Sequence, residues 1–263
     1  MTRIVQVDSF TAEAFQGNPA GVCFVDGEKD DSWMRGVAAE MNLAETAFLR
    51  RRADGSYDLR WFTPVAEVDL CGHATLASAH VLWEDGDLPE SETARFHTKS
   101  GLLKADRRGD WIELDFPATP PETIAPPEGL LDALGVKARS VGRSRFDYLV
   151  ELDSEEAVAR LTPDLRRLAE LPVRGTIVTA PSSSPRDDFV SRFFAPAVGV
   201  PEDPVTGSAH CCLAPFWSAR LGKDTLLARQ ISSRGGVLRL RLAGDRVLLG
   251  GQAVTVIRGD LLA

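Results

Sequence analysis

Two stretches of the chain carry the same turn: "DLCGHATLA" at residues 69–77 and "PVTGSAHCC" at residues 204–212. At an offset of 135 residues, Cys71-Gly72-His73-Ala74 aligns with Thr206-Gly207-Ser208-Ala209. Each turn opens a segment that is apolar or small on nearly every side, which is typical of a helix buried inside a structure. An internal repeat of this kind predicts a chain built from two related halves.

The repeat continues beyond the turn at the same offset. "LLKADRRGDWIEL" (102–114) aligns with "VLRLRLAGDRVLL" (237–249), and each stretch has the pattern of two strands joined by a Gly-Asp turn. Upstream, "WFTP" (61–64) matches "FFAP" (193–196) at an offset of 132, so the second copy holds three extra residues before its glycine turn.

The segments further upstream share a pattern of helix, break and strand, residues 32–49 in the first copy and 164–180 in the second. An offset of 132 places Glu45 opposite Ile177. Each half is therefore expected to contain a helix, several strands, the glycine turn, a central helix and a hairpin.

These patterns predict an α+β fold of two pseudo-symmetric lobes, each a curved, mostly antiparallel, barrel-like sheet around a central helix, with the active site in the cleft between them. We expect the N-terminal lobe to span residues 1–116, with 251–263 returning to it, and the C-terminal lobe to span 117–250. The charged, Pro-rich stretch "PATPPETIAPPEG" (117–129) is expected to connect the lobes.

Composition excludes some classes of function. The 263 residues are 44% hydrophobic and 26% charged, as is ordinary for a globular protein with a sizeable core. A net charge of −8 argues against nucleic-acid binding. No run reaches the roughly 18 apolar residues of a membrane helix, and the N-terminus lacks the apolar core of a signal peptide. We therefore expect a cytoplasmic protein without nucleic-acid or membrane partners.

The two glycine turns are candidate anion sites. The first N–H groups of a helix are free and carry partial positive charge, so a carboxylate or phosphate is stabilised there. Ser208 would act as a helix cap or as a hydrogen-bond donor, and the helix start would favour the neutral form of His73. The alternative is that both turns are simply well-capped helix starts.

Two carboxylates are candidates for chemistry. Glu45 lies at the start of an apolar strand in "NLAETAF", where a carboxylate is costly to bury unless it has partners or a function such as general acid/base catalysis. The alternative is a solvated surface glutamate. Asp203, in the three-residue insertion, is expected to orient a substrate, to pair with His73, or merely to complement the helix dipole.

Cys71 precedes the first turn and could serve as a thiol base, or be only a small buried residue. Its counterpart is Thr206, so a symmetric pair of thiol bases is excluded. "HCC" (210–212) with Cys71 and His73 would suggest zinc, but adjacent cysteines on a helix point about 100° apart and do not easily share one ion. The sequence therefore predicts neither a metal nor a cofactor.

Several motifs, taken together in order, resemble those of the phenazine-biosynthesis PhzF family, within the diaminopimelate-epimerase-like fold. They are "VDSF" (7–10), "GNPAGV" (17–22), "MNLAETAF" (41–48), "FTP" (62–64), "CGHATLA" (71–77), "FFAP" (193–196) and "EDPVTGSAH" (202–210). The resemblance implies a cofactor-independent isomerase, usually a homodimer, whose founding activity is a proton shift on a dihydro-hydroxyanthranilate.

By motif matching, the resemblance assigns the proton-moving glutamate to Glu45 and the other catalytic positions to His73, Asp203 and Ser208. The residues it places around the substrate are Asn18, Cys71, Gly72, Ala74, Thr206 and Gly207, with Gly72 and Gly207 as backbone donors. Founding members have alanine in place of Cys71 and proline in place of Ala74, which leaves the substrate open.

The leading hypothesis is a cofactor-free isomerase that moves a proton on a small carboxylate metabolite, with Glu45 as general acid/base. A second hypothesis is an amino-acid racemase or epimerase that uses Cys71 as one base. A third is a metabolite-binding protein without turnover.

Overall fold

The computed structural model describes residues 2–262, and the chain divides into two compact units. Unit 1 comprises Met1–Asp115 together with Gly250–Ala263, and unit 2 comprises Phe116–Leu249. Both units combine a mixed, mostly antiparallel sheet with a few helices. The α+β class predicted from the sequence is confirmed.

Unit 1 builds its sheet from both ends of the chain. Its elements are β1 (Thr2–Ser9), β2 (Asn18–Phe24), α1 (Asp31–Met41), β3 (Glu45–Arg51), β4 (Tyr57–Phe62), β5 (Glu67–Val68), α2 (Gly72–Glu84), β6 (Ala94–Thr98), β7 (Gly101–Arg108), β8 (Trp111–Pro117) and β17 (Ala253–Leu261). Strand β17 pairs antiparallel with β1. Next, β1–β2 is antiparallel, β2–β3 parallel, β3–β4 antiparallel, β4–β6 parallel and β6–β7 antiparallel.

Unit 2 repeats this order of pairings. Its elements are β9 (Glu122–Thr123), α3 (Leu130–Leu134), β10 (Ser140–Arg143), β11 (Asp147–Glu151), α4 (Glu155–Ala159), α5 (Leu165–Ala169), β12 (Gly175–Pro181), β13 (Phe189–Phe194), the 3-10 turn η1 (Pro196–Val198), α6 (Gly207–Leu221), β14 (Thr225–Gln230), β15 (Gly236–Ala243) and β16 (Arg246–Gly251). From β10 to β15 the pairs are antiparallel, parallel, antiparallel, parallel and antiparallel. The sequence repeat is therefore a repeat of topology.

The hairpins of the repeat turn at the predicted Gly-Asp pairs. Gly109 joins β7 to β8 and Gly244 joins β15 to β16, and both have φ of 63°. Glycine adopts positive φ without steric cost, and a glycine in first position is the signature of a two-residue hairpin loop. The same residue type meets the same backbone requirement in each copy.

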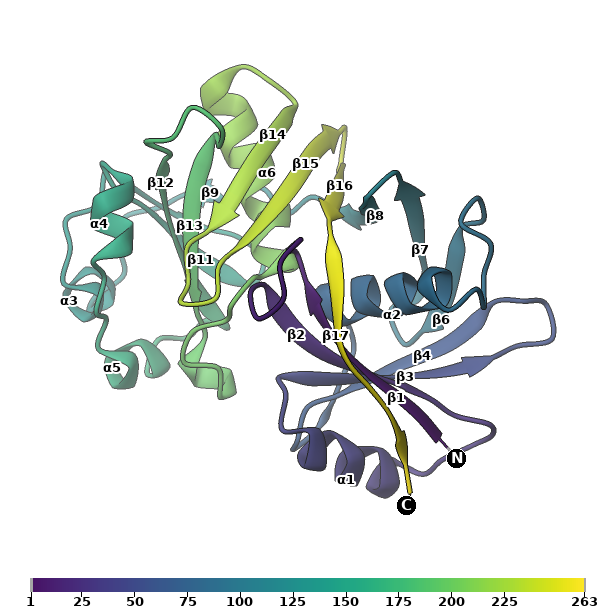
Figure 1. Cartoon of the computed structure of the whole chain (residues 1–263). Coiled ribbons are helices and arrows are strands. Elements are labelled where there is room, and N and C mark those ends of the chain that lie inside the picture. Colours follow the sequence, from purple (N-terminus) through teal and green to yellow (C-terminus); the bar gives the residue numbers. More distant parts are fainter. Residues whose placement is uncertain (1, 263) are drawn as a thin grey trace. The chain divides into compact units, whose positions relative to one another are not determined.

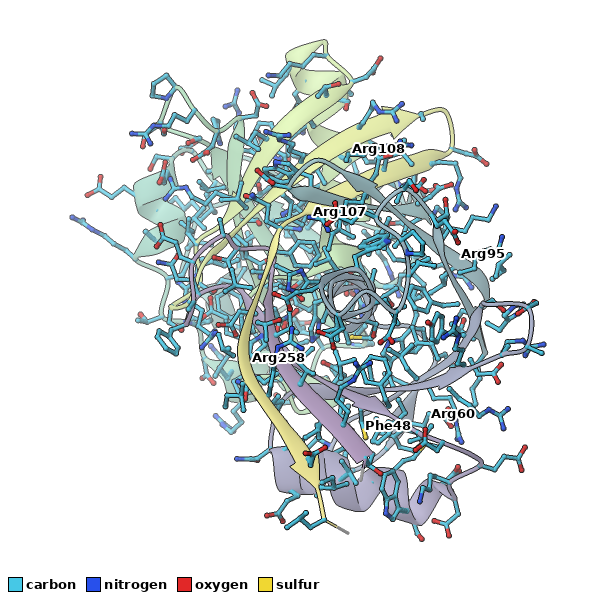
Figure 2. All side chains as sticks on the ribbon, turned by 45° about the vertical axis from the view of Figure 1, so that its right-hand side comes forward. Phe48, Arg60, Arg95, Arg107, Arg108 and Arg258 are labelled. Atoms are coloured by element: carbon cyan, nitrogen blue, oxygen red, sulfur yellow. The ribbon has the colours of Figure 1, made fainter. Side chains whose placement is uncertain are left out.

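Two helices cover opposite faces of the unit 1 sheet, as Figure 1 shows for α1 and α2. The amphipathic α1 buries Met34 and Val37 against Phe48 of β3, which is labelled in Figure 2. The other helix, α2, is buried along most of its length against β1, β2 and β3. Because successive strand residues point to opposite faces, Glu45 points away from the Phe48 side, towards α2.

The first segment of unit 2 is only partly a connector. Within 117–129, β9 pairs with β10, so this stretch contributes a short strand to the unit 2 sheet and the prediction of a simple connector is corrected.

The same stretch also donates a hydrogen bond to α6. Pro215 has no N–H to donate to the Cys211 carbonyl, and that carbonyl accepts a hydrogen bond of 3.0 Å from Thr119 N instead. Helix α6 therefore continues past its proline.

Ion pairs hold β17 against the end of α2. Arg258 of β17, labelled in Figure 2, pairs with Glu84 and Asp85 at the C-terminal end of the helix. Among residues 2–262, no helix combines the length and the apolar character that spanning a membrane requires.

Candidate functional site

Four of the sequence-predicted residues come together in unit 1, from three different elements. His73, in the first turn of α2, places Nε2 3.2 Å from Oε2 of Glu45 at the start of β3. The other ring nitrogen, Nδ1, lies 3.5 Å from Sγ of Cys71 and 3.3 Å from the side-chain amide of Asn18. The imidazole therefore sits between an acid on one side and a thiol and an amide on the other.

The backbone around the turn is fixed by hydroxyl groups. Cys71 is the N-cap residue of α2 in an extended conformation, and Gly72 begins the helix. Ser9 Oγ donates to the His73 carbonyl at 2.8 Å, and Thr75 Oγ1 donates to the Cys71 carbonyl at 2.6 Å. These bonds hold the helix start against β1 and limit the orientations open to His73.

Glu45 is not a solvated surface residue. Its side chain is 19% exposed and its Oε2 atom is buried. The His73 side chain beside it is 9% exposed. A buried carboxylate needs a charged or hydrogen-bonding partner, and the imidazole supplies one.

The structure corrects the expected charge of His73. Burial alone lowers the pKa of His73, but the neighbouring Cys71 and Glu45 groups outweigh burial and raise it well above 6.5. The Glu45 carboxylate, 3.2 Å from the ring, favours the charged form of His73, which is opposite to the effect of the helix start on which the sequence prediction rested. Burial likewise raises the pKa of the Cys71 thiol, and the neighbouring His73 opposes that rise.

Glu45, Cys71 and His73 also offer three ligand atoms within 4.8 Å of one another. Thiolate, imidazole and carboxylate are donors that zinc accepts. The adjacent cysteines that the sequence argument considered, Cys211 and Cys212, lie instead in α6 of unit 2, and burial raises the pKa of each to about 12. The expectation of no metal stays a prediction.

In unit 2, the residues before α6 form a hydrogen-bonded loop. Thr206, the N-cap residue, donates through Oγ1 to Asp203 Oδ2 at 2.5 Å. The buried Gln230 accepts from Thr206 N at 2.9 Å and donates to the Asp203 carbonyl at 2.7 Å. Sequence analysis missed Gln230, because only the fold brings the end of β14 to this loop. The Asp203 carboxylate is therefore bonded to the N-cap residue of α6, and the choice among its expected roles stays a prediction.

Ser208 is not the helix cap. It lies one residue inside α6, after Gly207, and its Oγ accepts a hydrogen bond of 3.0 Å from Nη2 of Arg174. Arg174 also donates from Nε to Asp147 Oδ1 at 2.9 Å and from Nη2 to Asp147 Oδ2 at 2.5 Å. Arg174 and Asp147 were not among the sequence candidates. The available signal was an acid opening the apolar strand "DYLVE", the kind of position that singled out Glu45.

The strand registers also correct the counterpart of Glu45. Thr46 pairs with Phe62 in unit 1, and Thr176 pairs with Phe194 in unit 2, so Glu45 corresponds to Gly175 and not to Ile177. The sequence offset failed because the loop between β12 and β13, residues 182–188, is longer than the loop between β3 and β4, residues 52–56. Arg174 therefore immediately precedes the counterpart of Glu45.

Comparison with known proteins matches this chain end to end. The family model for phenazine biosynthesis-like proteins, PhzC-PhzF, covers residues 7–259. An uncharacterized isomerase of Halalkalibacterium halodurans is 57% identical over 263 residues, 99% of this chain and 98% of that protein. One of Pseudomonas aeruginosa is 52% identical over 258 residues, 98% of each. A crystal structure of a PhzF-family protein of Enterococcus faecalis has a TM-score of 0.95 at 42% identity, covering 100% and 99% of the two chains.

Proposed function

Because the chain belongs to the phenazine biosynthesis-like protein family, and close relatives are named isomerases, we propose that it is a cofactor-independent isomerase that moves a proton on a small carboxylate metabolite. The observation that carries the proposal is the buried contact of 3.2 Å between Glu45 and His73. A carboxylate and an imidazole in this contact form a proton-transfer pair, and their side chains are only 19% and 9% exposed.

The charges of the pair suit the reaction. With its raised pKa, His73 carries a proton at neutral pH, so a positive charge lies beside Glu45, the group that we assign as the base. Glu45 would take a proton from a carbon near the substrate carboxylate, and the electrons of that C–H bond would enter the adjacent double-bond system. Returning the proton to a different carbon completes the shift, with no net gain or loss of atoms or electrons.

The developing negative charge needs hydrogen-bond donors. The first N–H groups of α2, where Gly72 lies, and of α6, where Gly207 lies, have no intrahelical acceptors, so each helix start by itself is suited to stabilise a negatively charged oxygen. We assign Ser208 and Asp203 to orienting the substrate, Asn18 to orienting the His73 ring, and Ala74 and Thr206 to binding the substrate. A cytoplasmic homodimer stays a prediction.

Exchange of carbon-bound hydrogen tests the proposal even while the product of the reaction is unidentified. A panel of carboxylic-acid metabolites is incubated with the protein in D₂O, and deuterium uptake is followed by NMR. Wild type should label at least one acid, and Glu45→Gln should lower the rate by about 10²–10⁴, the usual contribution of a general acid/base. Glu67→Gln is the matched control, since Glu67 is 11% exposed and pairs with Arg60 at 2.7 Å. Equal exchange by Glu45→Gln and wild type would refute the assignment.

The two alternatives give different results in the same experiment. If Cys71 is a racemase base, Cys71→Ala abolishes exchange at a stereocentre; full activity of that variant removes this alternative. If the protein only binds metabolites, calorimetry detects an acid that binds with equal affinity to wild type and Glu45→Gln, and neither protein exchanges hydrogen.

A further inference from the structure

Corresponding positions of the two units carry opposite chemistry. In unit 1, Glu45 at the start of β3 contacts His73 in the first turn of α2. In unit 2, Arg174 just before β12 contacts Ser208 in the first turn of α6, and Ser208 is the repeat counterpart of His73. The same framework therefore presents a proton-transfer pair in one unit and a cation with a hydroxyl in the other.

Arg174 is held in place from several sides. The carboxylate of Asp147, which is 1% exposed, receives two hydrogen bonds from the guanidinium, and the ring centroids of Phe146 and Phe193 lie 5.3 Å and 5.4 Å from its central carbon. Asp147 begins β11, Arg174 precedes β12 and Phe193 lies in β13. These three strands are neighbours in the sheet (Figure 1). A guanidinium fixed in this way loses little conformational freedom when it binds a ligand.

Gly175 makes this packing possible. A Cβ atom at Gly175 would lie 2.4 Å from Cζ of Phe193, closer than real Cβ contacts come, and 3.0 Å from the Phe194 carbonyl oxygen, a tight contact. The aromatic ring can therefore reach Arg174 only because the following residue has no side chain. The counterpart of Gly175 in unit 1 is Glu45. The position that carries a carboxylate in unit 1 is therefore a glycine in unit 2, and this glycine leaves the space in which Phe193 packs against Arg174.

The Arg174 guanidinium has N–H donors beyond those that bind Asp147 and Ser208. Asp147 and Ser208 engage Nε and Nη2, whereas Nη1 donates no hydrogen bond to any residue from 2 to 262. The Arg174 side chain is 35% exposed, so solvent or a ligand can reach it. Since Ser208 Oγ already accepts from Arg174, its own hydrogen is directed elsewhere, which makes Ser208 a donor towards the same ligand.

We infer that Arg174 and Ser208 form a binding site for the carboxylate of an organic acid. Two N–H groups of Nη1 and the Ser208 hydroxyl are the donors, and the buried Asp147 orients the guanidinium. This inference rests on the proposed function in one respect, that the acid bound here is the one whose proton is moved. It assigns carboxylate recognition to a side-chain cation that no sequence motif pointed to.

The test compares an acid with its own primary amide. The acid most active in the exchange panel, or the tightest binder by calorimetry if none exchanges, is measured with its amide against each protein. Wild type should prefer the acid by roughly ten- to hundredfold, the contribution of a hydrogen bond to a charged group. Arg174→Met should bring this ratio close to one by weakening acid binding, Ser208→Ala should lower it in part, and Arg174→Lys should retain an intermediate preference.

The control is Arg220→Met. Arg220 is 36% exposed, pairs with Glu151, a carboxylate that is 4% exposed, and stacks on Phe216, so it reproduces the setting of Arg174 without Ser208. It should leave the acid-to-amide ratio unchanged. If Arg174→Met folds poorly, Ser208→Ala keeps the Asp147–Arg174 pair and still tests the site.

Three outcomes separate the two proposals. Arg174-dependent acid preference without any hydrogen exchange supports the carboxylate site and refutes the proposed reaction. Exchange with an unchanged acid-to-amide ratio in both Arg174→Met and Ser208→Ala refutes the carboxylate site alone. Equal weakening of acid and amide in Arg174→Met shows a purely structural role and also refutes it.

Discussion

Arg174→Met should destabilise unit 2 by about 3–5 kcal/mol, the cost of removing one partner from a buried ion pair. The structure makes the loss of stability larger when Arg174 is removed than when the charge of Asp147 is removed. Asp147 is 1% exposed and would be left without its two hydrogen bonds from Arg174, whereas Arg174 is 35% exposed and reaches water. Asp147→Asn should therefore cost only about 1–2 kcal/mol, close to the loss of one charge-assisted hydrogen bond.

The double variant Asp147→Asn/Arg174→Met isolates the reason for the loss. It removes the charge that Arg174→Met would leave buried, so it should be more stable than Arg174→Met alone. Burial raises the pKa of Asp147 above 3.8, and Arg174 opposes that rise. Without Arg174 the folded state binds the Asp147 proton more tightly than the unfolded state does, so the deficit of Arg174→Met should shrink as pH falls through the raised pKa.

The assay is urea unfolding followed by circular dichroism at pH 7 and pH 5. Trp217 is the single tryptophan of unit 2, so its fluorescence gives a second probe of that unit. A loss of 3–5 kcal/mol corresponds to a fall in Tm of roughly 6–20 °C for a chain of this size. A loss below about 1 kcal/mol in Arg174→Met, or a double variant less stable than Arg174→Met, would refute the reasoning.

Other single sites give three more tests. Hydrogen bonds from Ser183, the largest influence, and the charge of Arg229 lower the pKa of Glu155 to about 2. The ionised Glu155 therefore stabilises the folded state above pH 4.5, and this stabilisation is lost as pH falls towards 2. Calorimetry should show that Glu155→Gln lowers Tm at pH 6 but not near pH 2. Gly175→Ala should cost about 1–3 kcal/mol by overpacking against Phe193, whereas Gly27→Ala, with open space around it, should be neutral in the same urea titration. Dialysis against EDTA should leave the exchange rate unchanged, and a loss restored by Zn²⁺ would instead make Glu45, Cys71 and His73 metal ligands.

The sequence predicted the parts of the fold that depend on local signals. Gly109 and Gly244 mark their hairpins because a two-residue turn requires a positive φ, and the apolar character of α2 and α6 marks buried helices. The assignment of Glu45 and His73 to one site rested on motif matching, and the contact between them was not predicted, since nothing local shows which face of β3 looks towards α2.

The remaining features depend on register and on contacts distant in sequence. Glu45 was aligned with Ile177 because pattern matching does not show that the loop between β12 and β13 is longer than the loop between β3 and β4. The Asp147–Arg174 pair joins residues on either side of a parallel crossover, 27 positions apart, and its partnership appears only once β11 and β12 are side by side. The upward shift of the His73 pKa was missed because the sequence does not give the distance of the ring from Glu45.

Nitrogen-15 NMR of the four histidine rings at pH 7 is the most direct measurement of the proposed charged pair. His210 is an internal neutral reference, because burial lowers its pKa to about 4 and its Nδ1 donates to the Thr206 carbonyl at 2.8 Å. Our account predicts that His73 is protonated on both ring nitrogens in wild type and becomes neutral like His210 in Glu45→Gln. A neutral His73 in wild type, or a ring whose charge does not respond to Glu45→Gln, would contradict it.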